Sequence, residues 1–333
     1  MLNPLWRLEL VMTRPQGPTC IKISLSGPVS TFRLSSPVPS NFSDDHRQPP
    51  EKGEATEIHA MASVHSTLTY WLVNHPNIVN FTWTEGETLG STVLFVSVVV
   101  SVYLSATLLL RSSIDSLPSL GPTILKPLTA LHSLILCLLS LIMAIGCTLS
   151  ITTDPTASLF NAICFPLDVK PNGPLYFWAQ VFYLSKILEF GDTILIILGK
   201  SIQRLSFLHV YHHATVVVMC FLWLRTRQSM FPIALVTNST VHVIMYGYYF
   251  LCAVGSRPRW KRLVTDCQIV QFVFSFGLSG WMLQEHLFGS GCSGIWGWCF
   301  NAAFNASLLA LFFNFHSKNY AKKTSRQGDR KSD

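Results

Sequence analysis

Seven apolar runs of roughly 20 residues follow residue 85 and limit what this chain can fold into. They cover residues 89–110, 127–149, 175–198, 207–224, 230–252, 263–287 and 295–315. A bilayer core about 30 Å thick needs about 20 apolar residues per helix. Charged residues make up only 12% of the chain, roughly half the share of a soluble domain. The sequence therefore predicts an all-α membrane protein in which seven transmembrane helices form a bundle.

Basic residues in the connections predict how this bundle is oriented. Connections on one side carry 14 Lys and Arg residues, and those on the other side carry 3. The positive-inside rule then places the C-terminus in the cytosol and residues 61–88 in a lumen or outside the cell. Because the basic residues are spread between apolar runs, the net charge of +7 does not indicate nucleic-acid binding.

The chain divides into four parts by composition. Residues 1–60 hold eight of the 18 prolines and no sustained apolar run, a composition typical of disorder. Structured, aromatic-rich sequence begins at Met61, so we expect residues 1–60 to be an extension outside the native chain. Residues 61–88 are the expected lumenal segment, 89–316 the catalytic membrane domain and 317–333 a basic cytosolic tail.

Charged side chains interrupt the third apolar run. The stretch KILEFGDT contains Lys186, Glu189, Asp192 and Thr193, whose helical angles place them on one face. Each charge at mid-bilayer costs roughly 2.5–3.5 kcal/mol on insertion scales. That face should therefore look into the bundle, either as a functional site or as a Lys186–Glu189 pair that joins helices.

Two later runs carry further polar stripes. In NSTVHVIMYGYY, spacings of three and four residues align Asn238, His242, Met245, Tyr246 and Tyr249. In TDCQIVQF they align Thr265, Gln268 and Gln271. Asn, His and Gln also bridge membrane helices by hydrogen bonds, so packing alone remains an alternative. Several stripes together favour a polar chamber that is entered from the cytosol.

The histidine box HVYHH (His209, His212 and His213) opens the fourth run. A metal site is one interpretation, since membrane di-iron desaturases and hydroxylases use such spacing, but two irons need about eight ligands. None of the other eight histidines pairs at i+3 or i+4 with another, so we expect no metal. Neutral imidazole can instead accept an acyl group from a thioester and pass it on, provided that water is excluded.

Four motifs in order, KILEFGDT, HVYHH, NSTVHVIMYGYY and TDCQIVQ, resemble the signature series of the ELO-type very-long-chain fatty acid elongases. The resemblance covers about residues 61–320, and WTEGETLGSTV and LHSLILCLLSL are closer to the plant branch. It implies a seven-helix bundle around an acyl tunnel in the endoplasmic reticulum membrane, with a lumenal N-terminus. The implied activity is condensation of acyl-CoA with malonyl-CoA to a 3-oxoacyl-CoA two carbons longer, without a cofactor. The implied partners are membrane lipid and the other enzymes of the elongation cycle.

The resemblance also implies roles for single residues. His212 would carry the acyl group, with His242 and Asn238 handling the proton or the thioester carbonyl. His209, His213 and Tyr246 would stabilise the negative charge that follows loss of CO₂. The implied substrate-binding set is Lys186, Glu189, Asp192, Tyr246, Gln268 and Gln271.

The nine cysteines raise a separate question. Cys164 and Cys292 fall in connections expected in the oxidising lumen, where a disulfide is stable. Cys299 is a rival partner, and free thiols are the other interpretation.

Two other classes of membrane protein fit part of the sequence. A seven-helix receptor explains the helix count but not the polar stripes. A transporter does use intramembrane Lys, Glu, Asp and His, but it usually shows an internal repeat, and none is evident.

Overall fold

The computed structural model describes residues 52–116, 120–153, 159–256 and 258–317, and these are helices joined by short connections. The described residues from Ala55 onward belong to one compact unit. The expectations for residues 1–51 and for the basic tail after Ser317 concern parts outside the described residues. Within the described ranges the only extended pairing is an isolated bridge between Thr82 and Asn172.

The N-terminal boundary differs from the prediction. Helix α1 runs from Lys52 to Thr69 and crosses the position where structured sequence was expected to begin. Residues 52–60, which composition assigned to the disordered extension, are therefore helical. A π-helical turn, Tyr70–Asn74, and the short α2, Pro76–Val79, complete this segment.

The membrane helices lie where the apolar runs predict them, to within a few residues. They are α3 Val93–Ser112, α4 Pro122–Thr153, α6 Pro174–Leu188 with α7 Phe190–Leu198, α8 Phe207–Thr226, α9 Phe231–Ala253, α10 Lys261–Phe288 and α11 Ile295–His316. A short α5, Leu159–Ile163, joins α4 to α6. Five of the described helices, α3, α4, α8, α10 and α11, are long and apolar enough to cross a bilayer. The chain is an all-α, multi-pass membrane protein; the count of seven spans remains a prediction.

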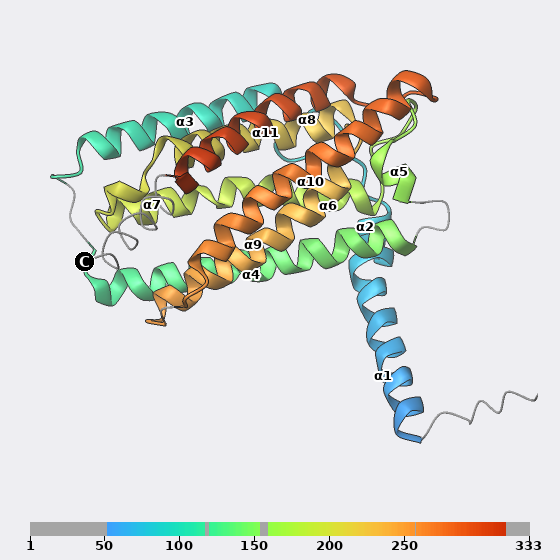
Figure 1. The fold of residues 1–333 in the computed structure, drawn as a ribbon, viewed down its shortest axis with the longest axis horizontal. Helices are drawn as coiled ribbons and strands as arrows, with labels where there is room; N and C mark the ends of the chain where they lie inside the picture. The colour runs from blue at the N-terminus through green and yellow to red at the C-terminus, as the bar shows by residue number, and fades with distance from the viewer. Residues whose placement is uncertain (1–51, 117–119, 154–158, 257, 318–333) are drawn as a thin grey trace, which may run out of the picture. The chain divides into compact units, whose positions relative to one another are not determined.

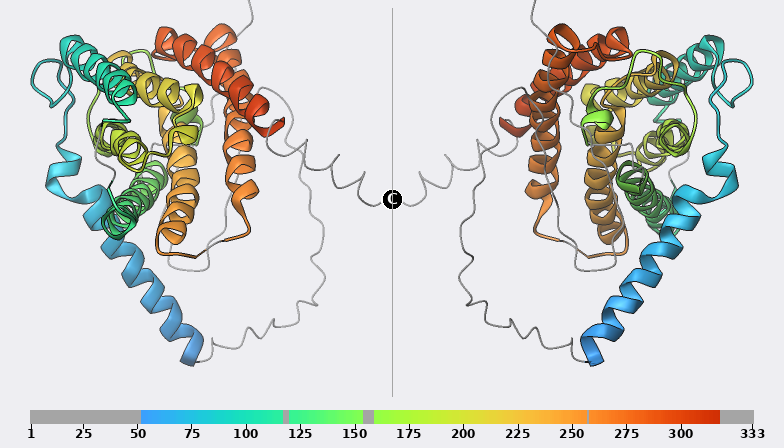
Figure 2. Two further views of the ribbon diagram at one scale, coloured as in Figure 1. Left: turned by 90° about the vertical axis from the view of Figure 1, so that its left-hand side faces the viewer. Right: turned by 90° about the vertical axis from the view of Figure 1, so that its right-hand side faces the viewer.

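Six of these helices close a ring. Going around it, α4 packs on α6, α6 on α8, α8 on α11, α11 on α10, α10 on α9, and α9 returns to α4. Figure 1 labels these helices in a side view. Helix α3 lies outside the ring against α7 and α8, as the end-on views in Figure 2 show. The ring brings together the polar faces of α6 to α10, which are far apart in the sequence.

A glycine allows the closest approach between α4 and α6. A Cβ atom at Gly146 would lie 2.3 Å from the indole ring of Trp178. That distance is far below van der Waals contact, so a larger residue would push the two helices apart. The Trp178 Nε1–H also donates to the backbone oxygen of Leu72, 2.9 Å away, which ties the N-terminal segment to the ring.

The third predicted span is two helices rather than one. Helix α6 ends at Leu188, α7 begins at Phe190, and Glu189 forms the turn between them. The Asp192 N–H donates to the Glu189 carbonyl oxygen at 3.0 Å, a three-residue spacing that tightens the helix locally. The break therefore falls at the charged motif.

Cys164 and Cys292 form a disulfide that joins the connection before α6 to the connection before α11. This is the pair that the sequence favoured, and Cys299 remains a free, exposed thiol. The bond ties together two points that are 128 residues apart.

We expect Cys164→Ser to lower the free energy of unfolding by roughly 2–5 kcal/mol, because the bond no longer restricts the unfolded chain. Thermal unfolding in detergent, with and without reductant, measures this. Reductant should lower the melting temperature of the wild type but not that of the variant, and Cys299→Ser should behave as wild type. Equal melting temperatures for Cys164→Ser and wild type would contradict the expectation.

Candidate active site

The histidine box occupies the first two turns of α8. Ser206 caps this helix, and its Oγ accepts a hydrogen bond from the His209 backbone N–H at 3.2 Å. A capped start fixes where the helix begins and therefore which way the box faces. His213 is buried, whereas His209 and His212 are partly buried.

A buried ion pair faces the box from α6 and α9. The Lys186 Nζ donates to Glu189 Oε1 at 2.8 Å and to the side-chain oxygen of Asn238 at 3.1 Å. The His242 Nδ1 lies 3.2 Å from the same Glu189 oxygen. Lys186 is 1% exposed and Glu189 2%, so each charge depends on the other for compensation.

Asp192 and Tyr246 form a second polar contact, one turn further along α7. The Tyr246 hydroxyl donates to Asp192 Oδ2 at 2.7 Å, and the Asp192 Oδ1 atom lies 3.3 Å from His132 Nε2 of α4. The hydroxyl proton of Tyr246 thus faces the carboxylate. This geometry gives no direct support to the predicted role of Tyr246 as a donor to substrate.

Thr193 connects the box to α3. Its hydroxyl lies 2.8 Å from His209 Nε2 and 3.1 Å from the hydroxyl of Tyr103. The His209 ring in turn lies 4.4 Å from the His213 ring, centre to centre. The orientation of the box is therefore set by hydrogen bonds to α7 as well as by α8 itself.

These groups surround a cavity of about 310 Å³ inside the ring. Its lining includes the predicted site residues His209, His212, His213, Asn238, His242, Glu189, Asp192, Tyr246, Gln268 and Gln271. Lys186 is the exception, since it is not part of the lining. Its buried contacts fit a group that holds Glu189 and Asn238, whereas the predicted contact with substrate is not seen.

The cavity mouth carries exposed positive charge. Arg204, just before α8, and Lys261, at the start of α10, belong to the lining and are exposed. Within the described part of the chain, neither has a carboxylate partner at ion-pair distance. These cations are suited to an anionic group that arrives from the side predicted to be cytosolic.

Three buried polar atoms at the cavity have no hydrogen-bond partner among the described residues: Glu189 Oε2, His212 Nδ1 and His213 Nδ1. Buried polar groups normally have partners, so such a cluster indicates where a polar ligand or water binds. Residues 88–328 match the family described as ELO, the GNS1/SUR4 family. The chain belongs to the ELO family. The resemblance predicted from the four motifs is confirmed.

Relatives of this ELO chain come from plants, animals and amoebae. It is 29% identical to "Fatty acid elongase 3-like" of Arabidopsis thaliana over 265 residues, which are 75% of this chain and 91% of the relative. It is 33% identical to "Very long chain fatty acid elongase 2" of Rattus norvegicus over 235 residues, 67% of this chain and 78% of the relative. "Fatty acid elongase A" of Dictyostelium discoideum is 36% identical over 203 residues, 58% of this chain and 72% of the relative. These similarities leave assignment to the plant branch as a prediction.

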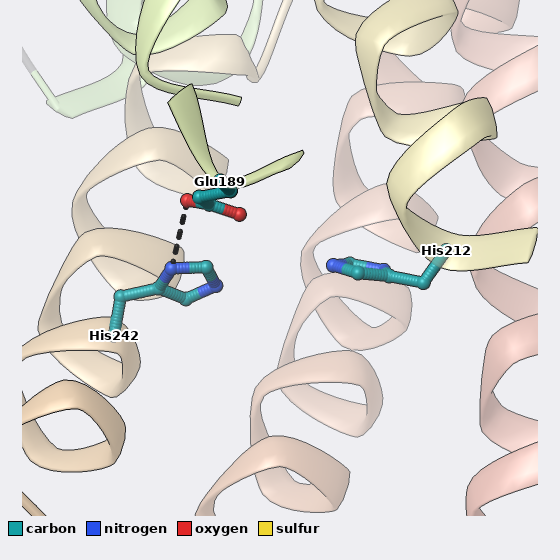
Figure 3. Close-up of side chains that lie close together, drawn as sticks. All are labelled: Glu189, His212 and His242. Carbon is teal, nitrogen blue, oxygen red and sulfur yellow. Dashed lines mark ion pairs between the residues drawn. The ribbon is translucent and has the colours of Figure 1, made fainter. Parts of the chain in front are cut away.

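Three side chains of the ELO site meet the minimum requirement for a metal ion. Glu189, His212 and His242 each offer a ligand atom, and these atoms lie within 4.8 Å of one another. Figure 3 shows His212 facing the other two across a gap. Helical spacing could not reveal this cluster, because its three members come from separate segments of the chain. Lys186 Nζ, 2.8 Å from Glu189 Oε1, opposes a second cation there, so the expected absence of metal stays our prediction.

Two residues that contact this site were missed from sequence. His132 of α4 approaches Asp192, and Tyr103 of α3 approaches Thr193. His132 was set aside because no other histidine follows it at helical spacing. An ionisable residue within an apolar run is itself a sign of function, and that signal would have found it.

Proposed function

We propose that this ELO chain elongates fatty acids by condensing an acyl-CoA with malonyl-CoA. The products are a 3-oxoacyl-CoA two carbons longer, CO₂ and CoA. The observation that supports this proposal best is the position of His212. It lines the cavity inside the ring and faces the Glu189–His242 pair (Figure 3), while the exposed side chains of Arg204 and Lys261 belong to the same lining.

In the first step, an imidazole nitrogen of His212 attacks the thioester carbonyl of the acyl-CoA. A carbon–nitrogen bond forms, the carbon–sulfur bond breaks, and the imidazole proton moves to the departing thiolate. Asn238 is placed to polarise the carbonyl, and the Glu189–His242 pair can relay the proton. The acyl-imidazole would hydrolyse in water, so an enclosed cavity favours the reaction.

In the second step, malonyl-CoA loses CO₂ and the electron pair of the broken carbon–carbon bond remains as an enolate. The enolate carbon attacks the acyl carbonyl, the bond to His212 breaks, and the departing imidazole takes up a proton that the solvent supplies. His209 and His213 line the same cavity and can stabilise the developing negative charge. Gln268 and Gln271 on α10 offer amide groups to the substrate.

The charge distribution suits CoA substrates that enter from the cytosol. Arg204 and Lys261 are exposed at the mouth and would attract the phosphates of CoA. We place the protein in the endoplasmic reticulum membrane, with its C-terminus in the cytosol and residues 61–88 in the lumen. The elongation cycle requires further enzymes to reduce and dehydrate the product, and these are the expected partners. No cofactor is needed for the condensation.

Purified protein incubated with a long-chain acyl-CoA and ¹⁴C-malonyl-CoA labelled at carbon 2 should yield labelled 3-oxoacyl-CoA without nicotinamide. Product formation should require malonyl-CoA and should continue in the presence of metal chelators. Double-bond formation that needs oxygen and iron would instead identify a histidine-box desaturase. Uptake of either substrate into vesicles, without formation of any new acyl product, would indicate a transporter. His65→Ala is the control, because His65 is exposed and far along the chain from the cavity-lining helices.

A further inference from the structure

Two carboxylates, Glu189 and Asp192, line the cavity three residues apart. Glu189 has Lys186 and His242 as its partners. The Tyr246 hydroxyl donates to Asp192 Oδ2 at 2.7 Å, and His132 Nε2 lies 3.3 Å from Asp192 Oδ1 without the alignment of a hydrogen bond. Within the described residues, no other basic side chain lies at ion-pair distance from Asp192. Each carboxylate thus has a basic side chain of its own beside it, and the one for Asp192 comes from a helix that carries none of the four motifs.

We propose that His132 is a positioning residue of the elongation site, which acts through Asp192 and Tyr246. The inference rests on the proposed function. His132 is not part of the cavity lining, so it would not touch substrate. It keeps the charge of Asp192 directed toward α4 and Tyr246. A partly buried carboxylate that loses a neighbouring polar partner is costly to leave uncompensated, which favours its turning toward another basic group.

This arrangement keeps the Asp192 carboxylate from interacting with His242. The His242 ring lies 5.5 Å from the ring of Tyr246, centre to centre, and Tyr246 is completely buried. If Asp192 lost His132, its carboxylate would compete with Glu189 for His242. The pair that faces His212 would then lose its fixed geometry. Small displacements of reacting groups lower rates strongly, even when substrate binding is retained.

Gly191 shows that the His132 ring is held closely. A Cβ atom at Gly191 would lie 2.6 Å from His132 Cε1, and its next two nearest atoms, both at 3.2 Å, are the ring nitrogens of His132. The His132 ring therefore packs directly on the backbone of α7, beside Asp192. Gly191→Ala should push this ring aside, because the three atoms nearest to the added methyl group all belong to the ring.

The experiment compares His132→Ala, Gly191→Ala and the double variant in purified full-length protein. The concentration of competent sites comes from the acyl adduct, and turnover is expressed per adduct. This normalisation removes the effect of a variant that merely folds less well. We expect each single variant to lower kcat on the order of tenfold, the loss of one charged contact, with KM changed less than about twofold. The double variant should be no worse than His132→Ala, because Gly191→Ala acts only through the ring.

Two further variants complete the test. The amide nitrogen of His132→Gln can occupy about the position of His132 Nε2, so this variant should recover most of kcat. Cys137→Ala is the matched control on α4: the Cys137 thiol contacts the backbone oxygen of Val243 on α9 at 3.5 Å and should not affect turnover.

The outcomes separate the two proposals. Wild-type kcat per adduct in His132→Ala overturns the role of His132. The role of His132 is also overturned if the fold-decrease in kcat of the double variant equals the product of the fold-decreases of the two single variants. Absence of condensation by the wild type would overturn the proposed function, and the role of His132 with it.

Discussion

His212→Ala should form no acyl adduct with a long-chain acyl-CoA and should lower condensation by at least about a thousandfold. His212 lines the cavity opposite Glu189 and His242 and is partly buried, so its imidazole is reachable by a thioester. Removing a nucleophile leaves only binding and electrostatic effects to promote the reaction. Intact mass after incubation with acyl-CoA alone should show one added acyl group in the wild type and none in the variant.

The same experiment distinguishes two orders of reaction. An adduct in the wild type and in His65→Ala, but not in His212→Ala, supports transfer through His212 before malonyl-CoA reacts. Product formed from both substrates without any adduct would mean direct condensation in a ternary complex. His212 would then act as a base or as a binding group, and the nucleophile assignment would be wrong.

Much of the site was predictable because unpaired polar groups are energetically costly in the apolar core of a bilayer. The cost of Lys186, Glu189 and Asp192 in an apolar run already required that they face the protein interior. Helical spacing then aligned Asn238, His242 and Tyr246 on one face of α9. The predicted stripes on these helices do meet around one cavity, and His212 lies in its wall.

The order of the helices around the ring could not be predicted from the sequence. Periodicity shows which face of a helix is polar, but it does not show which helix lies opposite. The contact of α4 with α9 and α7, which brings His132 to Asp192, is of this kind. The same holds for Tyr103 and Thr193. The meeting of Glu189, His212 and His242 from three separate segments was missed for the same reason.

The break at Glu189 was also missed, and it lies beside a contact between two helices. KILEFGDT reads as a continuous apolar helix with a charged face, and Gly191 is a weak signal inside such a run. In the structure, the backbone at Gly191 lies against the ring of His132. A tertiary contact thus accompanies a change in helical geometry that local propensity does not encode.

Lys186→Met should lower the free energy of unfolding by roughly 3–5 kcal/mol, the cost of leaving a buried charge without its partner. Lys186 Nζ contacts Glu189 Oε1 at 2.8 Å and lies 4.3 Å from the centre of the Phe182 ring. Methionine keeps the apolar contacts of the side chain and removes the ammonium group, which also donates to Asn238. Glu189, 2% exposed, would then be left with His242 as its only ion-pair partner among the described residues. Unfolding in detergent, followed by intrinsic fluorescence, measures the loss.

The double variant Lys186→Met/Glu189→Leu separates stability from activity. Replacing both members of a buried pair by apolar residues is often neutral or stabilising, so most of the lost stability should return. Activity should not return, because His242 would have lost the carboxylate that orients it opposite His212. A Lys186→Met single variant as stable as the wild type would show that His242 alone compensates Glu189. An active double variant would show that the pair holds the helices together without taking part in the reaction.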